Sequence, residues 1–314
     1  MTGSAGFIGS HLTDRLLEQG DRVLGIDSFD SYYGRRQKLS NLSEAFAHPR
    51  FTLVRGDLKT LRWGRHLSRG TRVYHLAAQP GVRGSWGENF HRYVENNILA
   101  TQSVFETVAA AGWRNRIVYA SSSSIYGEQP AGAMPEAARP NPISPYGMTK
   151  LAGEHLARAY AEAYQLPIVS ARFFTVYGPR QRPDMAFHRF FGAAMARRPI
   201  EVFGTGRQLR DFTYVSDIVD GVVRAAESNT AEPVLNLGRG SPVRLSEAVR
   251  GIAEVTGRKL KIVRRALPAG DPSATWADTR LARREIGYRP RVRLPEGLGR
   301  QWEWQKRLRG GSSP

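Results

Sequence analysis

The feature that most constrains the fold is an alternation of short apolar strands with amphipathic helices over the first three quarters of the chain. Segments rich in β-branched residues are typical of buried strands, and they occupy residues 22–27, 51–54, 73–77, 116–120 and 168–172. Helical periodicity appears between them, at residues 10–19, 94–111 and 149–164. This alternation predicts an α/β fold built on a doubly wound parallel sheet with right-handed crossovers.

The last third of the chain differs in composition from the rest. Residues 179–210 and 241–293 contain more Pro, Gly and Arg, with short elements between them, and we expect a smaller α/β lobe over the carboxyl edge of the sheet. The predicted domains are interleaved: residues 1–172 and 211–240 form a nucleotide-binding domain, and residues 173–210 and 241–314 form the smaller lobe. Residues 309–314 are expected to be a disordered tail.

A glycine pattern, Gly3-x-x-Gly6-x-x-Gly9, stands directly before the helix predicted at residues 10–19. Glycines allow a tight turn and let a pyrophosphate approach the helix N-terminus. Asp27 ends the next strand, where a carboxylate can accept both ribose hydroxyls of NAD and would repel the 2′-phosphate of NADP. We therefore predict a Rossmann-type domain with NAD bound at Gly3, Gly6, Phe7, Ile8, Gly9 and Asp27.

Further stretches fit the same cofactor. Asp57 and Leu58 follow a predicted strand and can meet the adenine, whereas Leu76, Ala77 and Ala78 end another strand with residues small enough to leave space. Asn97, within the helix predicted at residues 94–111, can hydrogen-bond a nearby backbone or ligand group. One element is missing, because the chain opens Met1-Thr2-Gly3 where a complete strand should precede the turn. Either the start codon is assigned too late, or the strand is supplied in another way.

Tyr146-x-x-x-Lys150 is the central chemical signal. Residues four apart share one helix face, so the ammonium can lie near the phenol. A tyrosine titrates near ~10, and a neighbouring Lys together with a cationic nicotinamide is expected to lower this pKa and free the phenolate as a base. Just upstream, a strand runs into residues 121–124, four serines whose hydroxyls can reach the same substrate oxygen. The Tyr-Lys pair, these hydroxyls and the glycine turn are jointly specific for a catalytic site.

Composition limits the possible partners. The absence of cysteine excludes a disulfide scaffold, a thiolate metal site and a cysteine nucleophile, and we expect no metal. The formal net charge of +18 suits anionic small molecules, but the arginines are scattered along the chain, so we expect no nucleic-acid partner. No apolar run approaches the ~18 residues of a membrane helix and no signal peptide is recognised, so we expect a cytoplasmic protein without a membrane partner.

The chain resembles extended short-chain dehydrogenases/reductases of the nucleotide-sugar epimerase/dehydratase group through GSAGFIGSHL, HLAA, YASSSSIYG, SPYGMTK, RFFTVYGPRQRPDM, RDFTYVSDI and GDPSATWAD. Within this group it is most similar to UDP-glucuronate 4-epimerases, particularly through SFDSYYGRRQKLSNL. The resemblance implies tightly bound NAD, a Rossmann domain with a small sugar-nucleotide lobe, and a homodimer that pairs through a four-helix interface. It implies Tyr146 as the base, Lys150 as its partner and Ser122 as the hydroxyl that shares the C4 oxygen.

The resemblance also implies how a UDP-sugar is held. Phe203 would pack on uracil, Arg210 would meet the diphosphate, and Asp271 would accept the uridine ribose hydroxyls. A substrate carboxylate would meet hydroxyl donors from Ser122, Ser123, Ser124 and Thr175 and a charged donor from Arg182. Clamping this carboxylate away from alignment with the C4 carbonyl would slow loss of carbon dioxide.

The expected reaction follows from a missing acid. Related 4,6-dehydratases and decarboxylases place a carboxylate just before the Ile/Val-Tyr-Gly sequence, where this chain has Ser123 and Ser124. Without this proton handler, the simplest outcome of C4 oxidation is return of the hydride to the opposite face after the sugar rotates. We expect NAD-dependent 4-epimerisation of UDP-glucuronate to UDP-galacturonate through a 4-keto intermediate. A UDP-glucose 4-epimerase, a UDP-glucuronate decarboxylase and an inert NAD-binding regulator remain alternatives.

Overall fold

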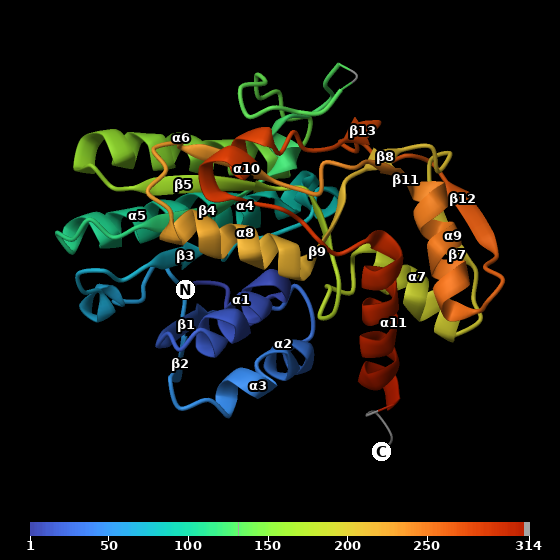
Figure 1. Ribbon diagram of the computed structural model, residues 1–314, viewed down its shortest axis with the longest axis horizontal. Coiled ribbons are helices and arrows are strands. Elements are labelled where there is room, and N and C mark those ends of the chain that lie inside the picture. Colours follow the sequence, from blue (N-terminus) through green and yellow to red (C-terminus); the bar gives the residue numbers. More distant parts are fainter. Residues whose placement is uncertain (131, 311–314) are drawn as a thin grey trace.

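The computed structural model describes residues 1–130 and 132–310 and confirms the predicted α/β class with parallel sheets (Figure 1). The strands of the central sheet are β1 (Val23–Asp27), β2 (Phe51–Arg55), β3 (Val73–His75), β4 (Ile117–Ser122), β5 (Ile168–Phe173) and β10 (Val234–Leu237). Strand β1 pairs in parallel with β2, and β3, β4, β5 and β10 pair in parallel in that order. The five strands predicted from the sequence are therefore present, with ends that differ by one or two residues.

The position between β1 and β3 is occupied by the first two residues of the chain. Thr2 forms parallel bridges to both Ile26 and His75, which joins the two groups of strands at the centre of the sheet. The amino group of Met1 donates to Leu24 O at 2.6 Å, and burial lowers the pKa of this amine to about 5. Where the sequence lacks a complete first strand, Met1 and Thr2 provide the pairing directly before the glycine turn.

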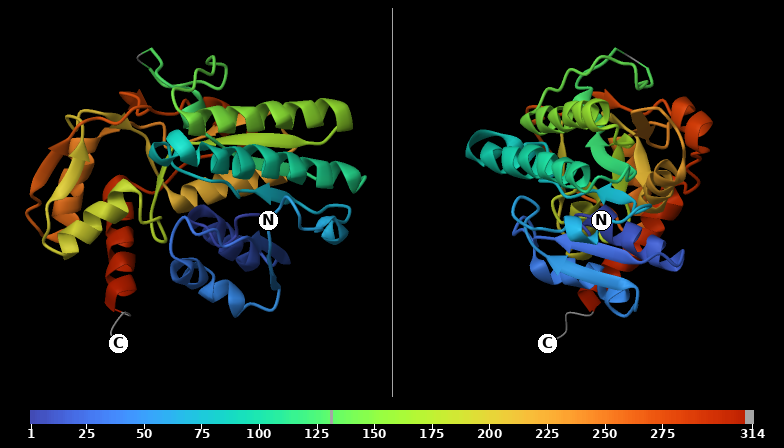
Figure 2. Two further views of the ribbon diagram at one scale, coloured as in Figure 1. Left: turned by 180° about the vertical axis from the view of Figure 1, so that it is seen from behind. Right: turned by 90° about the vertical axis from the view of Figure 1, so that its left-hand side faces the viewer.

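Helices cover both faces of the central sheet (Figure 2). Along β4, Ile117 and Tyr119 belong to the core shared with α5 (Ala100–Ala110) and α6 (Pro145–Tyr164), whereas Val118 and Ala120 belong to the core of the opposite face. That opposite core includes α1 (Phe7–Glu18) and α8 (Val215–Glu227), which pack against each other. This alternation of buried side chains is what a parallel sheet covered on both faces requires.

Three helices differ from the sequence prediction at their starts. Helix α1 begins at Phe7, inside the glycine pattern, rather than at residue 10. Helix α6 begins at Pro145 rather than at residue 149, because Ser144 accepts a hydrogen bond from Gly147 N as the N-cap and proline occupies the first turn. The helix expected at residues 94–111 comprises α4 (Phe90–Tyr93), a π-helical segment, η4 (Val94–Leu99), and α5.

The remaining elements surround the sheet or build the smaller lobe. Near the main sheet lie α2 (Arg35–Asn41), α3 (Ser43–Phe46), α10 (Arg280–Ile286) and the short helical turns η1 (Gly64–His66), η2 (Arg83–Ser85), η3 (Gly87–Asn89) and η5 (Ser123–Ile125). The smaller lobe contains α7 (Ala186–Met195), α9 (Leu245–Thr256), α11 (Leu294–Gly310), β7 (Ile200–Phe203) and β12 (Ile262–Arg265). Short pairings β6–β9 and β11–β8–β13 involve β6 (Thr175–Tyr177), β8 (Leu209–Arg210), β9 (Phe212–Tyr214), β11 (Val243–Arg244) and β13 (Ala274–Thr275).

We propose that these two groups of elements correspond to the interleaved domains expected from the sequence, except that α10, within residues 241–314, packs against β10 and α8 of the larger domain. Helix α11 continues to Gly310, so residues 309 and 310 of the predicted tail are helical, whereas residues 311–314 lie outside the described residues.

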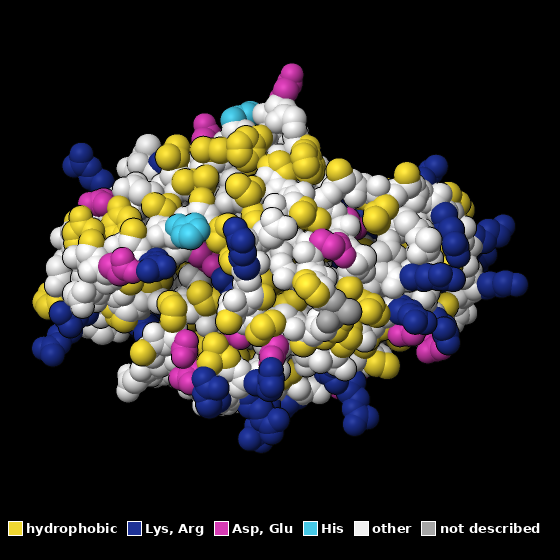
Figure 3. Space-filling view, turned by 90° about the horizontal axis from the view of Figure 1, so that it is seen from above, with side chains coloured by type: hydrophobic (Ala, Val, Ile, Leu, Met, Phe, Trp, Pro, Cys, Tyr) yellow, Lys and Arg dark blue, Asp and Glu magenta, His cyan; other side chains and the backbone are white. Residues whose placement is uncertain are grey.

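None of the helices in residues 1–130 and 132–310 is long and apolar enough to cross a membrane. On the face shown in Figure 3, Lys and Arg side chains lie at both ends and along one side rather than in one continuous patch.

Close contact between α6 and β4 predicts a measurable effect on stability. A Cβ at Gly153 would lie 2.1 Å from the hydroxyl oxygen of Tyr119, which is buried. Gly153→Ala should therefore lower the free energy of unfolding by roughly 1–3 kcal/mol, despite the better helix propensity of alanine. Gly299→Ala in α11 is the matched control, because nothing lies within 4 Å of its Cβ, and it should raise stability by up to about 1 kcal/mol. Urea denaturation measures both, and an undiminished stability for Gly153→Ala would contradict this packing.

Candidate active site

The glycine turn joins the start of the chain to α1 at the carboxyl edge of the sheet. Gly3 has φ +70°, and a Cβ there would lie 2.7 Å from Ala77 N. A Cβ at Gly9 would lie 2.0 Å from Gly3 O, so the turn and the helix approach too closely for any side chain. Gly6 is the N-cap of α1 without a side-chain cap, which leaves the first amides of the helix available to an anion.

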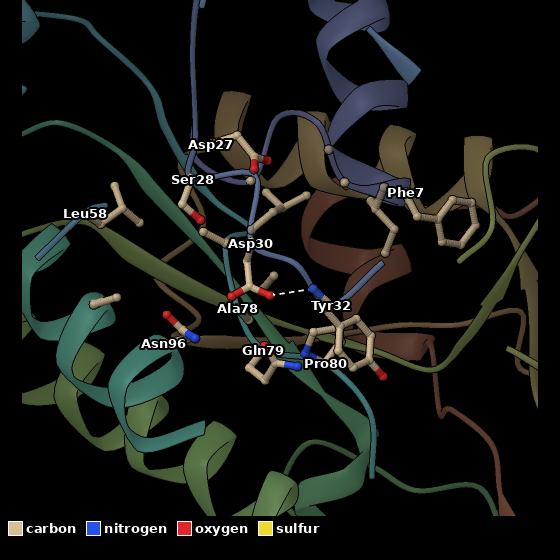
Figure 4. A pocket seen from close by; sticks show the side chains of 18 of the residues that line it. Phe7, Asp27, Ser28, Asp30, Tyr32, Leu58, Ala78, Gln79, Pro80 and Asn96 are labelled. Atoms are coloured by element: carbon tan, nitrogen blue, oxygen red, sulfur yellow. Dashed lines mark hydrogen bonds between the residues drawn. The ribbon is translucent and has the colours of Figure 1, made fainter. Parts of the chain in front are cut away.

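A cavity of about 220 Å³ opens beside this turn. Its lining includes almost every residue that the sequence assigned to the cofactor: Gly3, Gly6, Phe7, Ile8, Gly9, Asp27, Asp57, Leu58, Leu76, Ala77, Ala78, Tyr146 and Lys150. These residues come from the glycine turn and the start of α1, from the ends of β1, β2 and β3, and from the first turns of α6 (Figure 4 shows part of the lining). The cavity therefore lies where parallel sheets bind nucleotides, at the carboxyl ends of the strands.

Asn97 is the predicted cofactor residue that does not line the cavity. Its side-chain oxygen accepts from Gln79 N at 2.7 Å, and its amide nitrogen donates to Gln79 O and to the Thr149 hydroxyl. The neighbouring Asn96 lines the cavity instead. Both residues lie in the π-helical segment η4, whose wider turn shifts the register of the side chains from that of an α-helix. Asn97 thus fixes the cavity wall and the start of α6.

Asp27 lies at the end of β1 with its carboxylate held in place by the backbone. One oxygen accepts from Ala5 N at 2.9 Å and the other from Phe29 N at 2.8 Å. Each carboxylate oxygen has a second lone-pair site, so these contacts orient Asp27 without exhausting its capacity to accept ribose hydroxyls.

The segment after β1 supplies cavity residues that the sequence analysis did not assign. Lys38 Nζ donates to Asp30 O at 2.8 Å and lies 4.8 Å from the centre of the Tyr33 ring. The Tyr33 hydroxyl is buried at the cavity without a hydrogen-bond partner, and Asp30 accepts from Tyr32 N at 2.8 Å (Figure 4). The only sequence signal for these residues is the SFDSYYGRRQKLSNL segment, which supports the family resemblance alone.

The residues present fit a dinucleotide. The glycine turn would be blocked by any Cβ, the unpartnered Tyr33 hydroxyl can donate to a polar ligand, and the Asp27 carboxylate retains acceptor capacity. A buried polar group without a partner is costly unless a ligand or water satisfies it. The described residues contain no cluster of three or more His, Asp or Glu side chains that could hold a metal ion.

Tyr146 lies in the first turn of α6 and faces the cavity. Burial raises the pKa of its phenol, whereas a hydrogen bond with Ser122 and the charge of Arg182 lower that pKa. The net direction is upward, so the sequence-based expectation of a lowered pKa does not hold for these side chains by themselves. The charge of Arg182 is the one that lowers this pKa.

Lys150 is buried one turn further along α6. Its ammonium donates to Ala120 O at 2.8 Å, at the end of β4, and lies 5.1 Å from the centre of the Tyr119 ring. Burial lowers the pKa of Lys150 to about 7, and the nearby Glu154 carboxylate opposes this shift. A lysine with this pKa exchanges its proton near neutrality, as proton-transfer chemistry requires.

Arg182 is the predicted carboxylate-binding residue that reaches the cavity. It donates to both oxygens of Asp184, from Nε and Nη2, each at 3.0 Å, and lies 5.9 Å from the centre of the Tyr32 ring. Ser122 accepts from Ser124 N at 3.1 Å in the turn that ends β4, whereas Thr175 begins β6. Ser121, rather than Ser122, Ser123 or Ser124, lines the cavity wall.

The three residues predicted to hold UDP form a separate cluster in the smaller lobe, outside the cavity lining. Arg210 and Asp271 form a salt bridge, and the ring of Phe203 lies 3.9 Å from the Arg83 guanidinium carbon. Burial lowers the pKa of Arg83, Asp271 raises it, and Arg189 and Arg210 lower it. Arg83 and Arg210 therefore share one acidic neighbour, Asp271, whereas Arg189 pairs with Glu201 at 2.7 Å. Such an excess of cations is suited to a diphosphate. Sequence analysis missed Arg83 and Arg189, because only the tertiary fold brings them to Phe203.

Comparison with known proteins agrees with this geometry. Residues 1–238 match the model of the NAD-dependent epimerase/dehydratase family. The UDP-glucuronate 4-epimerase of Thermodesulfobacterium geofontis is 36% identical over 313 residues, which cover 98% of this chain and 95% of that protein. An uncharacterised UDP-glucose epimerase of Bacillus subtilis, YtcB, is 41% identical over 300 residues, which cover 95% of this chain and 94% of that protein.

A solved structure is similar over nearly the whole length. The UDP-glucuronic acid 4-epimerase of Bacillus cereus, in complex with UDP-glucuronic acid and NAD, superposes with a TM-score of 0.93 at 39% identity, covering 98% of each chain. The family expected from the sequence motifs is thereby confirmed, together with its Rossmann-type fold and its use of NAD. The chain belongs to the NAD-dependent epimerase/dehydratase family.

Proposed function

We propose that this chain is an NAD-dependent UDP-glucuronate 4-epimerase, which interconverts UDP-glucuronate and UDP-galacturonate. The observation that carries the proposal is the grouping of the Tyr146 phenol with the Arg182 cation at one cavity, where Ser122, outside the lining, hydrogen-bonds the phenol. This grouping offers a base for the C4 hydroxyl and a cation for a carboxylate, while Ser123 and Ser124 offer no acid for dehydration. The similarity to proteins named UDP-glucuronate 4-epimerase supports the same assignment.

In the proposed mechanism, Tyr146 takes the proton from the C4 hydroxyl as hydride leaves C4. Ser122 hydrogen-bonds the phenol and orients it toward the shared substrate oxygen. The guanidinium of Arg182 favours the phenolate, which burial disfavours, and we propose that the Lys150 ammonium, one helical turn away, adds a second favourable charge. NAD, when bound, supplies the hydride acceptor and donor for C4. After the sugar rotates, Tyr146 returns the proton, so acid and base are the same residue.

UDP is proposed to bind at the cluster in the smaller lobe. Phe203 offers a ring for uracil, Arg210 with Arg83 and Arg189 offers cations for the diphosphate, and Asp271 offers an acceptor for ribose. Rotation of the sugar requires firm binding of UDP and looser binding of the hexose. A charged UDP subsite away from the cofactor cavity satisfies this requirement, because the strong contacts lie outside the volume in which the sugar turns.

A UDP-glucose 4-epimerase is the second candidate, favoured by one specific observation. Arg182 already forms a bidentate ion pair with Asp184, so its charge is compensated before any substrate carboxylate arrives. A neutral sugar would require no further cation. The name of the Bacillus subtilis relative points in the same direction.

A homodimer built on residues 94–111 and α6 is also proposed. Large apolar side chains are exposed on these segments, with Leu99 50%, Met148 54% and Tyr164 52% accessible. The Tyr160 and Tyr164 rings stack at 5.5 Å, and the Tyr160 hydroxyl donates to Glu106 on α5, so the two helices form one surface. Residues that are exposed and apolar together are typical of protein interfaces. A cytoplasmic location stays a prediction from the sequence.

The central experiment incubates the purified protein with UDP-glucuronate, and separately with UDP-glucose, and resolves the products chromatographically. UDP-galacturonate should form from UDP-glucuronate at a higher kcat/KM than UDP-galactose forms from UDP-glucose. Tyr146→Phe should lose roughly 100-fold or more in kcat while UDP-sugar affinity stays nearly unchanged, because the phenol oxygen acts in proton transfer. Faster turnover of UDP-glucose would favour the second candidate, and a loss of only a few-fold in Tyr146→Phe would identify another base.

Arg182→Ala tests the origin of carboxylate selectivity. Loss of a charge-assisted hydrogen bond typically costs ~1.5–3 kcal/mol, so kcat/KM for UDP-glucuronate should fall by roughly ten- to two-hundred-fold. The kcat/KM for UDP-glucose should fall far less. The variant should also release more 4-keto-pentose, because the carboxylate of its bound substrate is free to align with the C4 carbonyl. Arg198→Ala, at an exposed arginine of the smaller lobe, is the control and should leave kcat/KM unchanged for both substrates. Equal losses for both sugars in Arg182→Ala would make this residue a scaffold element.

The dimer interface can be tested with a single charge. The wild-type protein should scatter light as a particle of twice the chain mass of 35.0 kDa at micromolar concentration. Leu99→Glu should give a monomer, because a carboxylate would be buried in an apolar contact. Leu39→Glu, at an exposed leucine of α2, is the matched control and should leave the mass unchanged. A wild-type monomer would reject the proposed dimer.

A further inference from the structure

Glu154 occupies the same face of α6 as the catalytic pair. Tyr146, Lys150 and Glu154 follow one another at intervals of four residues, which places them in line along the helix. The first two line the cavity, whereas Glu154 lies outside its lining and is only 9% exposed. A buried carboxylate so close to a catalytic ammonium needs partners, because an unpaired charge is strongly disfavoured in the interior.

The partners of Glu154 come from the two central strands. Arg172 on β5 donates to both carboxylate oxygens, from Nε at 2.9 Å and from Nη2 at 2.7 Å. The hydroxyl of Ser121, at the end of β4, donates to the oxygen that also accepts from Arg172 Nε. The third arginine nitrogen, Nη1, donates to the Tyr126 hydroxyl at 2.8 Å and to Glu136 O at 3.0 Å. The carboxylate is thereby fixed in one position between the cavity wall and the helix.

This network does not follow from stability alone. Replacing a buried ion pair by apolar residues of similar volume is often neutral or stabilising, because both charges lose their hydration. Glu154 and Arg172 could therefore be exchanged for aliphatic residues without loss of the contact between α6 and β5. What such a replacement would remove is a negative charge next to Lys150 and the acceptor that orients Ser121 at the cavity.

The environment of Lys150 contains few other anions. Burial lowers its pKa to about 7, and Glu154 is the charged group that raises this pKa. The group facing it from β3 is His75, whose pKa burial lowers to about 3, so the imidazole is neutral. The β4 side presents the Tyr119 ring, while Arg172 on β5 is paired with Glu154 and Arg182, after β6, lines the same cavity as Lys150. Glu154 is therefore the carboxylate best placed to favour the ammonium form.

We propose that Glu154, held by Arg172, is a positioning residue that keeps Lys150 charged and orients Ser121 at the cavity wall, so that Tyr146 can act as a base near neutral pH. The proposal rests on the proposed function for its turnover readout. It adds to the Tyr-Lys pair a third functional residue on α6, one that does not touch the substrate or the cofactor. It also gives the buried ion pair a role beyond joining helix to strand.

The test compares the pH dependence of kcat in the wild type and in Glu154→Gln. Loss of the carboxylate and exposure of Lys150 to the uncompensated Arg172 both favour the neutral amine. The alkaline limb, where Lys150 loses its proton, should move to lower pH by roughly one to two units, as expected for a unit charge a few ångströms away at an effective dielectric of about 20. If the limbs of the pH profile of kcat did not move and activity fell uniformly, the role of Glu154 would be purely structural, and the proposal would be overturned.

Two further variants keep the test decisive if Glu154→Gln folds poorly. Glu154→Gln combined with Arg172→Gln removes both buried charges, and its alkaline limb should lie between those of the wild type and the single variant. A double-variant limb that coincides with that of the wild type would overturn the proposal. Glu162→Gln removes a carboxylate from the same helix at an exposed site paired with Arg158, and it should leave the limbs unmoved. If Glu162→Gln moved them equally, the effect would be one of net charge alone.

A measurement without turnover separates this proposal from the proposed function. The ionisation of Lys150 can be followed by NMR of protein labelled with 15N-lysine, as the resonance that is absent from a Lys150→Met counterpart, with no UDP-sugar present. Glu154→Gln should move this titration to lower pH, because loss of the carboxylate and the unpaired cation of Arg172 both favour the neutral amine. A shifted titration with no turnover of any UDP-sugar would uphold this proposal and reject the proposed function. An unshifted titration in an active enzyme would do the reverse.

Discussion

The pairing of Thr2 with both Ile26 and His75 is the contact on which the rest of the structure depends. It joins β1 and β3, which would otherwise belong to separate sheets, and it fixes where the glycine turn starts. The Thr2 hydroxyl also hydrogen-bonds His75 Nδ1 at 2.8 Å and accepts from Ala77 N at 3.2 Å. The turn, the end of β3 and the wall of the cavity are thereby set relative to one another by one short segment. A binding site at the centre of a doubly wound sheet follows from this join.

The catalytic end of the cavity combines groups whose burial opposes their chemistry. Burial raises the pKa of Tyr146 and lowers the pKa of Lys150, so both shifts favour the neutral pair over phenolate and ammonium. The surrounding charges act in the other direction, with Arg182 favouring the phenolate and Glu154 favouring the ammonium. Desolvation and fixed charges therefore act in opposite directions at this site. Small changes in either can alter whether Tyr146 and Lys150 are charged or neutral.

Much of the fold and of the cofactor cavity could be predicted from the sequence, because strand ends and the glycine turn are local patterns. The register of Asn96 and Asn97 could not, since a π-helical segment replaces the expected α-helix. The orientation of Lys150 toward Ala120 O is likewise invisible in the spacing of Tyr and Lys, and it removes the direct contact that the spacing implied. Tyr33 in the loop after β1, Lys38 in α2 and Arg83 in η2 were missed because tertiary contacts, rather than local spacing, bring these segments to their sites.

The proposed role of Arg182 requires one cation to serve both a protein carboxylate and a substrate carboxylate. The pair with Asp184 uses the Nε and Nη2 donors, and a guanidinium has five N–H groups in a rigid planar fork. The remaining donors stay available, so Asp184 and a substrate need not compete for the same hydrogen bonds. Asp184 also accepts from the Tyr32 hydroxyl at 3.2 Å, which fixes its position at the cavity. The ion pair therefore holds the arginine ready in one orientation, so that little conformational entropy is lost when a second carboxylate binds.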